Sequence, residues 1–437
     1  MKLYYLQLLC LFIVVLGCDT DTVIVDDDDV NQTSKPNILL IIADDMGLDA
    51  TPGYSIAGTK PSMPTLDGLM ANGVKFTNVW SSPLCSPTRA GIITGKYGFR
   101  TGVTNVGQTL PTSEQSIHGY LDAINSGYSH AVIGKWHLSN RDVNHPNSIG
   151  VNEYAGVLGG GVPSYFSWDL VANRQTTNST TYTTTKFTDL AIDWIENQDT
   201  PWFLWLAYNA PHTPFHLPPN ALHSQGPLAS DEASIAANPL PYYLAMIEAM
   251  DTEIGRLLDA MPQEERDNTV IIFVGDNGTP NQVVQTYRSR RAKNSLYQGG
   301  INVPMVVSGK NVTRMGAEED ALLGTTDLFA TVAGITGANI TEIHDSKNFA
   351  PMFTNANVSV RDFVYSEIGD DANSTDFAIR DATYKYISFS NGNEAFYNVL
   401  DDPLETTNLL NANQLPLSNA ATTAKQNIEA ALINIKQ

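Results

Sequence analysis

Four apolar runs in the sequence each lead to polar residues, and this pattern constrains the fold most strongly. The runs lie in "PNILLIIADDMG", "HAVIGKWH", "PWFLWLAYNAPHTPF" and "NTVIIFVGDNG". Continuous runs such as Ile38–Ala43 are typical of strands buried on both faces of a parallel sheet. In open α/β sheets, ligands bind beyond the carboxyl ends of the strands, although each polar residue alone also fits a helix cap or a turn. The residues expected at this edge are Asp44, Asp45, Lys135, His137, His212, Asp276 and Asn277.

Two segments between these runs have the periodicity of amphipathic helices. They are Thr183–Gln198 and Pro241–Met261. One apolar stripe of the second segment consists of Leu244, Ile247, Ile254 and Leu258. Strands that alternate with helices favour a doubly wound sheet with helices on both faces. We therefore predict an α/β fold in which a large mixed, mostly parallel sheet is sandwiched by helices.

After about residue 355, the alternation of buried strands with amphipathic helices gives way to a different pattern. "FAIRDATYKYISFSNGNEAFYNVL" alternates apolar and polar residues around a turn at Asn391-Gly392, which predicts an antiparallel hairpin. The sequence thus divides into a catalytic domain at 35–355 and a smaller C-terminal α+β subdomain with an antiparallel sheet at 356–437.

The N-terminus has the layout of a secretory signal. Lys2 precedes a short apolar stretch, and the stretch ends at "VLGC", which has the form of a bacterial lipobox. Residues 1–17 are then a lipoprotein signal peptide, and Cys18 is the lipidated N-terminus. Residues 18–34 are acidic, and we interpret them as a solvated tether between the anchor and the folded domain. The protein is expected to be exported and lipid-anchored at the cell surface or a periplasmic membrane face, with no other membrane contact. An ordinary signal peptide with an incidental Cys18 is the alternative.

Cys85 is the only thiol left in the folded part of such a protein, because Cys10 leaves with the signal and Cys18 carries lipid. It lies in "SSPLCSPTRAGIITGKYGFRTG", where Pro87 and Gly95 mark the start and end of a short helix. A helix N-terminus favours anions, so a nucleophile here would face a negatively charged group. A buried structural cysteine is the alternative that the residues alone leave open.

The formal net charge of −21 limits the partners of the chain. It argues against nucleic-acid binding, which needs a basic surface. It also means that an anionic substrate must be attracted by a locally basic site and not by the field of the whole protein.

Several motifs resemble type I sulfatases of the alkaline-phosphatase superfamily. "CSPTRAGIITG" is similar to the first signature of that family and "GYSHAVIGKWHL" to the second. Further similar stretches follow in family order: "ADDMG", "APHTPF", "GDNG", "KNSLYQGGINVP" and "DDPLETTNL". The resemblance covers Pro36 to about Leu410 and implies an alkaline-phosphatase-like fold.

The resemblance implies that Cys85 is oxidised to formylglycine (3-oxoalanine) by a formylglycine-generating or sulfatase-maturing enzyme. Arg89 would hold the modified residue. The implied ligands of one divalent cation are Asp44, Asp45, Asp276 and Asn277. All four offer oxygen, which independently favours a hard cation, Ca2+ with Mg2+ as the alternative, over zinc.

The resemblance also implies the roles of the basic residues. Lys135 and Lys293 would bind sulfate oxygens. One hydroxyl of the hydrated aldehyde attacks sulfur, and deprotonation of the other by His137 later expels sulfate. His212, with Lys293, would protonate the departing alcohol. The chain departs from the family pattern at Gln298 and Asn302, where Glu and Arg are usual.

Two further groups are candidates for substrate binding. "TYRSRRAKNS" contains Arg288, Arg290 and Arg291, which suit bidentate contacts to a polyanionic glycan. A solvated charged loop is the alternative. His216 and His223 either line a substrate pocket or lie on a surface loop.

The sequence therefore predicts a sulfuric-ester hydrolase that acts on a sulfated carbohydrate, such as an oligosaccharide derived from a polysaccharide. An aryl sulfatase or a phosphonate or phosphate ester hydrolase of the same superfamily is the alternative enzyme. A glycan-binding surface lipoprotein without activity is the alternative that is not an enzyme.

Overall fold

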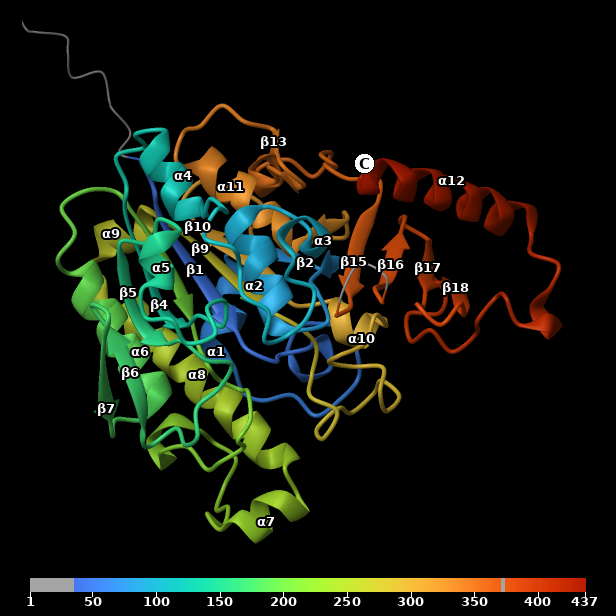
Figure 1. Cartoon of the computed structure of the whole chain (residues 1–437). Coiled ribbons are helices and arrows are strands. Elements are labelled where there is room, and N and C mark those ends of the chain that lie inside the picture. Colours follow the sequence, from blue (N-terminus) through green and yellow to red (C-terminus); the bar gives the residue numbers. More distant parts are fainter. Residues whose placement is uncertain (1–34, 371–373) are drawn as a thin grey trace, which may run out of the picture. The chain divides into compact units, whose positions relative to one another are not determined.

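The computed structural model describes residues 35–370 and 374–437 (Figure 1). The predicted signal peptide and tether, including Cys10 and Cys18, lie outside the described residues. Residues 35–437 form one compact unit. Within the described ranges, no helix is long and apolar enough to cross a bilayer.

A ten-stranded sheet forms the centre of the molecule, with strand order β11-β2-β10-β9-β1-β8-β4-β5-β6-β7. The strands β9, β1, β8, β4 and β5 are parallel neighbours, while β10, β6 and β7 pair antiparallel. The strands are β1(Asn37–Ala43), β2(Gly73–Phe76), β4(Ser129–Lys135), β5(Glu153–Val157), β6(Trp168–Ala172), β7(Gln175–Ser179), β8(Trp202–Ala207), β9(Thr269–Gly275), β10(Met305–Gly309) and β11(Ala317–Glu319). The predicted mixed, mostly parallel sheet is confirmed.

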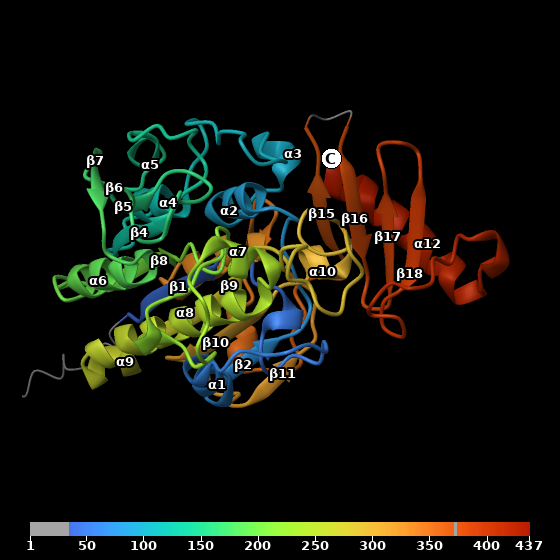
Figure 2. The ribbon, with the colours of Figure 1, turned by 90° about the horizontal axis from the view of Figure 1, so that it is seen from below.

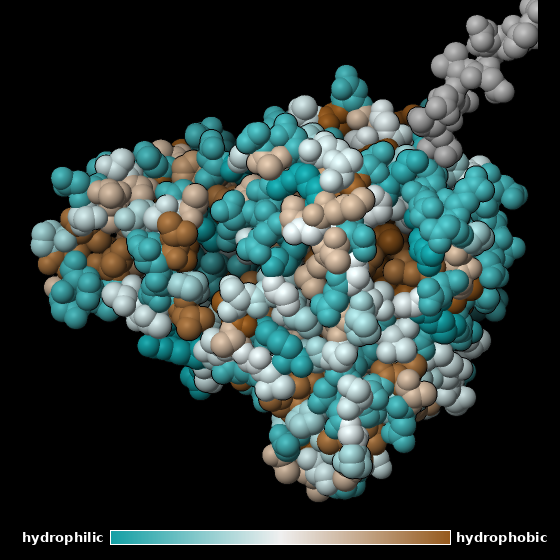
Figure 3. Space-filling model, turned by 180° about the vertical axis from the view of Figure 1, so that it is seen from behind, coloured by the Kyte–Doolittle hydropathy of each residue, from teal (hydrophilic) through white to brown (hydrophobic). Residues whose placement is uncertain are grey.

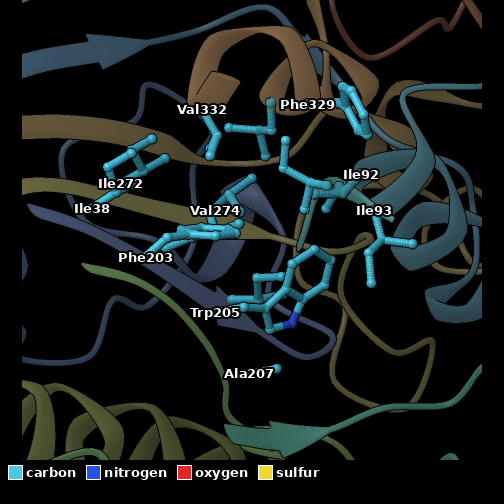
Figure 4. Packing of buried hydrophobic residues seen from close by; sticks show 14 of the residues in the cluster. Ile38, Ile92, Ile93, Phe203, Trp205, Ala207, Ile272, Val274, Phe329 and Val332 are labelled. Atoms are coloured by element: carbon cyan, nitrogen blue, oxygen red, sulfur yellow. The ribbon is translucent and has the colours of Figure 1, made fainter. Parts of the chain in front are cut away.

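Helices cover both faces of this sheet. Ile38, Leu40 and Ile42 of β1 pack on one face, and Leu39 and Ile41 pack on the other, because successive side chains of a strand point to opposite sides. The first face is covered by α2(Cys85–Thr94), α4(Ile117–Ala123) and α11(Leu328–Ile335). Figure 4 shows Ile92 and Ile93 of α2 and Phe329 and Val332 of α11 in this packing. The second face is covered by α1(Pro64–Ala71), α6(Thr183–Ile195) and α8(Leu240–Ala260). Both helices predicted from periodicity are present.

The C-terminal part contains a separate four-stranded antiparallel sheet of β15(Val364–Ile368), β16(Asp376–Arg380), β17(Tyr384–Ser388) and β18(Glu394–Asn398). The predicted hairpin is β17–β18, whose pairing closes at Ser388 and Glu394. The helix α12(Asn419–Lys436) packs on one face through Ala421, Ala424 and Ile428 (Figure 2). The boundary at residue 355/356 stays a prediction.

Short elements complete the chain. The strands are β3(Val79–Trp80), β12(Leu323–Gly324), β13(Glu342–Ile343) and β14(Ser346–Lys347), and the helices are α3(Gly98–Thr101), α5(His145–Ser148), α7(Glu232–Ala237), α9(Gln263–Asp267) and α10(Gln298–Ile301). The 3-10 turns are η1(Leu48–Ala50), η2(Asn220–Leu222), η3(Thr325–Asp327), η4(Ala350–Phe353) and η5(Ala412–Gln414). On the face in Figure 3, hydrophilic side chains cover much of the surface and hydrophobic ones form scattered patches, as a strongly acidic composition predicts.

Candidate active site

The carboxyl ends of β1, β9, β8 and β4 bring the predicted polar residues to one edge of the sheet. Asp44 and Asp45 follow β1, while Asp276 and Asn277 follow β9. The two loops touch, because the backbone N–H of Asp45 donates to Oδ1 of Asp276 at 3.0 Å. Lys135 ends β4, and His212 lies in the loop after β8.

Two of these residues adopt the left-handed backbone conformation. Asp45 has φ 71° and His137 has φ 60°. Residues other than glycine adopt this region at a cost, and surrounding contacts must hold them there. Each is the second residue after its strand, β1 for Asp45 and β4 for His137, so the abrupt turn keeps both side chains close to the edge of the sheet.

Cys85 is the first residue of α2, and it is 2% exposed. Its Sγ lies 3.2 Å from Nδ1 of His137. Burial raises the pKa of the Cys85 thiol, and the nearby Lys135 opposes this shift. The unmodified side chain is therefore a neutral thiol, which is a poor nucleophile.

Arg89 lies one turn further along α2 and is completely buried. Its Nε and Nη2 donate to Oδ2 of Asp276 at 3.1 and 2.7 Å, and its Nη1 donates to the carbonyl of Lys135 at 2.9 Å. Burial alone would lower the pKa of Arg89, but Asp276 and Asp44 raise it above its usual value. The guanidinium thus joins the ends of β4 and β9 beneath Cys85.

Two lysines pair with the carboxylates that follow β1. Lys135 Nζ lies 2.5 Å from Oδ2 of Asp44, and both side chains are fully buried. Lys293 Nζ lies 2.5 and 2.6 Å from the two carboxylate oxygens of Asp45. Asn277 Nδ2 donates to Oδ1 of Asp45 at 2.7 Å. The carboxylates and lysines therefore form one polar cluster.

Buried oxygens without a donor show where a cation fits in this cluster. Among the described residues, Asp44 Oδ1 and Asn277 Oδ1 are buried and accept no hydrogen bond. Ligand atoms of Asp44, Asp45 and His212 lie within 4.8 Å of one another. Burial and the neighbouring Asp44 raise the pKa of Asp276 to about 6, which indicates an excess of buried negative charge. The donor set fits a hard cation that prefers oxygen.

The two histidines are neutral in this environment. Burial, with the charge of Lys135, lowers the pKa of His137 to about 2 and that of His212 to about 4. Nδ1 of His212 is 2.7 Å from the carbonyl of Thr213 and donates to it, so Nε2 carries the free lone pair. That Nε2 lies 3.8 Å from Oδ2 of Asp45. Both imidazoles can therefore accept a proton at a nitrogen that faces the cluster.

A run of three glycines passes over the histidines, and the sequence reasoning missed it. A Cβ on Gly160 would lie 2.4 Å from Cε1 and Nε2 of His137, and a Cβ on Gly161 would lie 3.3 Å from Cε1 of His212. Only glycine permits the close approach at Gly160. The run "GGG" at 159–161 is the signal that would have found it.

Replacing Gly160 by alanine is expected to lower kcat by about 100-fold, because the imidazole of His137 must move away from the added methyl group and a displacement of about 1 Å has this effect. Steady-state kinetics measures the loss. Gly68→Ala is the matched control, since a Cβ there meets nothing within 4 Å. Equal kcat values for Gly160→Ala and Gly68→Ala would contradict the expectation.

The remaining candidates lie in different surroundings. Arg288 and Arg290 are exposed. Arg291 is directed toward the C-terminal sheet, where its Nη1 donates to the carbonyl of Glu405 and its guanidinium lies 4.1 Å from the ring centre of Tyr297. His223 Nδ1 accepts from the backbone N–H of Gln225. His216 belongs to a cluster of aromatic rings beside the active site.

Glu405 connects the C-terminal sheet to the loop that carries Lys293, a role that the sequence did not predict. Its Oε2 accepts from the backbone N–H of Gln298 at 2.6 Å, and its Oε1 pairs with Nζ of Lys385 at 2.6 Å. Glu405 and Lys385 are 1% and 0% exposed as side chains. Gln298 Oε1 in turn accepts from Nε1 of Trp80. Gln298, which stands where the family usually has Glu, is therefore held by hydrogen bonds to Glu405 and Trp80.

Glu405→Gln is expected to lower the free energy of unfolding by about 3–5 kcal/mol, because it leaves Lys385 charged, buried and unpaired. Burial lowers the pKa of Lys385 to about 8. Losing Glu405 lowers this pKa further, so the deficit relative to the parent protein shrinks as pH rises toward about 8 and the lysine of the variant loses its proton.

Urea unfolding at about pH 6 and about pH 9 measures this deficit. Glu429→Gln is the control, since Glu429 pairs with Lys425 on the surface of α12 and its loss is expected to cost under about 0.5 kcal/mol. A deficit for Glu405→Gln that is no larger than the control, or that grows with pH, would contradict the role of the ion pair.

The sheet order and the cluster at its carboxyl edge define a hydrolase of the alkaline-phosphatase-like superfamily. Residues 36–338 match the family model named Sulfatase, and the chain belongs to the sulfatase family. It is therefore a sulfuric ester hydrolase.

Curated relatives share moderate identity with the chain. Arylsulfatase G of Canis lupus familiaris is 28% identical over 77% of this chain and 70% of its own length. An uncharacterized sulfatase of Escherichia coli K12, YdeN, is 28% identical over 68% of this chain and 62% of its own length. Human N-acetylgalactosamine-6-sulfatase is 27% identical over 76% of this chain and 68% of its own length.

Solved structures have the same fold. Ps i-CgsB, in complex with k-i-k-neocarrahexaose, superposes with a TM-score of 0.76 at 26% identity and covers 91% of this chain and 92% of its own. BT4656, in complex with its substrate D-glucosamine-2-N,6-O-disulfate, has a TM-score of 0.76 at 19% identity and covers 92% and 98% of the two chains. At that identity the second structure supports the fold alone.

Proposed function

We propose that this sulfatase removes sulfate from a sulfated carbohydrate through a formylglycine made from Cys85. The contact that carries the proposal is the 3.2 Å approach of Cys85 Sγ to His137 Nδ1, at a helix N-terminus and beside buried Lys135. A neutral buried thiol is inert in this position, whereas a residue with hydroxyl groups would have a base directly beside it. The hydrated aldehyde supplies two hydroxyls on one carbon, one for attack on sulfur and one for the later release of sulfate.

The remaining steps, which are proton transfer and the stabilisation of negative charge, would be carried out by histidines and lysines of the site. The neutral imidazole of His137 accepts a proton from the hydroxyl beside it. Lys135 and Lys293 would stabilise negative charge on the sulfate oxygens, because Lys135 is fully buried and Lys293 is only 19% exposed, so that little water screens either charge. His212 and Lys293 both lie beside the carboxylate of Asp45, and they would protonate the departing alcohol.

Asp44, Asp45, Asp276 and Asn277 would hold one Ca2+. The two unpaired oxygens of Asp44 and Asn277 support this assignment. When bound, the ion would polarise a sulfate oxygen as a Lewis acid. Arg89 keeps Asp276 in place for this role through its two hydrogen bonds.

The carbohydrate part of the proposal rests on a structural relative. Ps i-CgsB was solved in complex with the oligosaccharide k-i-k-neocarrahexaose, and it is 26% identical to this chain with 91% of this chain covered. A panel of k-i-k-neocarrahexaose, D-glucosamine-2-N,6-O-disulfate and 4-nitrophenyl esters of sulfate, phosphate and phosphonate tests it. We expect sulfate release from a saccharide to exceed hydrolysis of the phosphorus esters. Preference for a phosphorus ester would reject the sulfatase assignment, and hydrolysis of only the aryl sulfate would reject the carbohydrate.

Mass spectrometry of the tryptic peptide Phe76–Arg89 tests the modification independently of activity. The aldehyde or its hydrate is expected in place of the thiol when a maturing enzyme is present. A peptide that keeps its thiol in a fully active preparation would reject the formylglycine.

Arg288 and Arg290 remain proposed contacts to further anionic groups of the substrate. Replacing both by alanine is expected to lower kcat/KM for a sulfated oligosaccharide about tenfold more than for 4-nitrophenyl sulfate, since both arginines are exposed and each exposed ion pair contributes up to about 1 kcal/mol. Equal effects on the two substrates would contradict the proposal.

Export and lipidation at Cys18 also remain proposals. Cys18→Ala tests them, because loss of the lipid anchor is expected to release the protein from membranes.

A further inference from the structure

A cavity of about 870 Å³ opens beside His212 and has no part in the chemistry described above. It lies between the loop after the glycine run, the loop that follows His212, and α7 with the residues around it. The lining residues are Pro163, Ser164, Tyr165, Phe166, Thr213, Pro214, Phe215, His216, Leu217, Ser230, Glu232, Ile235, Ala236, Pro239 and Gln282. A volume of this size accommodates a ligand larger than a sulfate ion.

One wall of the cavity is a cluster of aromatic rings. The ring centres of Tyr165 and His216 are 4.2 Å apart, and those of Phe166 and Tyr182 are 5.2 Å apart. Phe166 also meets His216 edge to face at 5.6 Å. Phe166 is nevertheless 42% exposed, so much of its ring stays free for contact.

The same cluster is joined to the active site. Oη of Tyr165 lies 2.7 Å from the carbonyl oxygens of both Asn209 and His212 and shares its one hydrogen between them. The next residue, Thr213, accepts from Nδ1 of His212 and also lines the cavity. A group in the cavity is thus adjacent to His212, the residue proposed to protonate the departing alcohol.

The lining selects against a second sulfate. It contains no lysine or arginine. Both nitrogens of His216 are engaged, by the carbonyl of Pro214 at 3.0 Å and by the hydroxyl of Tyr182 at 3.1 Å. Burial lowers the pKa of His216 to about 4, so the ring is neutral and offers no cation.

A few polar side chains are free to bind hydroxyl groups. Ser230, Glu232 and Gln282 line the cavity, are exposed, and make no side-chain hydrogen bond or ion pair with another described residue. An exposed aromatic face with a small number of polar groups at its rim suits a sugar ring, which has apolar C–H faces and a polar edge. The single carboxylate of Glu232 would repel a sulfate.

We propose that this cavity is a subsite for an unsulfated sugar ring on the leaving-group side of the scissile ester, stacked on Phe166. The inference rests on the proposed carbohydrate function. It assigns His216 to the support of the aromatic wall, with no direct contact to sulfate.

Phe166→Ala tests the subsite in the full-length, matured enzyme. The probes are 4-nitrophenyl sulfate and the oligosaccharide k-i-k-neocarrahexaose, because a single sulfated sugar has no further ring to enter the subsite. The ratio of kcat/KM for the saccharide to kcat/KM for the aryl ester is expected to fall about 5- to 150-fold, mainly through a higher KM, because stacking of a ring on an aromatic face is worth about 1–3 kcal/mol. Phe166→Tyr keeps the ring and is expected to restore the ratio to within about twofold of the parent.

Ile433→Ala is the control, because Ile433 is an exposed apolar residue of α12 with 62% of its surface accessible. It is expected to change neither rate constant. A ratio unchanged in Phe166→Ala, or lowered equally in Phe166→Tyr, overturns the subsite while the sulfatase activity stands. A parent enzyme that hydrolyses 4-nitrophenyl sulfate but no saccharide overturns the subsite and the carbohydrate function together.

Discussion

Cys85→Ala is expected to abolish hydrolysis of sulfate esters, with a loss in kcat of about 10⁴-fold or more, as for other enzymes deprived of the nucleophile. The variant keeps Arg89, Lys135 and the cluster of carboxylates, so it can still bind a sulfate ester. Steady-state kinetics measures the loss, and calorimetric titration with Ca2+ together with the unfolding temperature shows whether the site and the fold persist.

Ser86→Ala is the matched control for this variant. Ser86 is the next residue of α2, is fully buried, and has an Oγ without a hydrogen-bond partner among the described residues. Its loss leaves no group unsatisfied, so kcat is expected to stay within about threefold of the parent. Substantial turnover by Cys85→Ala would reject Cys85 as the source of the nucleophile.

Asp45→Asn is expected to lower Ca2+ affinity and kcat/KM by more than about 100-fold, which exceeds the usual effect of removing a residue that only supports a ligand. Burial alone would raise the pKa of Asp45, but Lys293 and His212 hold this pKa well below its usual range, so the carboxylate is charged at neutral pH. The amide keeps the shape of the side chain and removes that charge. Titration calorimetry and steady-state kinetics measure the two effects.

Asp251→Asn is the control for loss of a buried carboxylate elsewhere in the molecule. Asp251 accepts from the backbone N–H groups of Thr65 and Leu66 at the start of α1. We expect a loss of about 1 kcal/mol in stability and unchanged Ca2+ affinity. If Asp45→Asn and Asp251→Asn bind Ca2+ equally well, Asp45 is not a ligand.

Much of the architecture could be predicted because it depends on local patterns. The apolar runs before Asp44 and Asp276 identify buried parallel strands, and parallel strands necessarily bring their ends to one edge. The periodicity of Pro241–Met261 predicts α8 to within one residue at each end. The helix after Cys85 ends at Gly95 as expected, where φ is 68°.

The missed features depend on contacts between distant segments. The sequence around Gly160 does not indicate that the absence of a side chain at this position leaves space for the imidazole of His137. Glu405 lies in a motif that resemblance could align, but its pairing with Lys385 and Gln298 requires the packing of two sheets. Arg291 belongs to a basic stretch that suggested substrate contact, whereas the structure directs this side chain to the same junction.

Folding would place Cys85 beyond the reach of a modifying enzyme, because only 2% of the residue is accessible once α2 packs against the sheet. The proposed oxidation must therefore act on a chain that has not yet closed. Synthesis itself then sets a period during which the thiol is available, beginning when Cys85 emerges and ending when α2 packs against the central sheet.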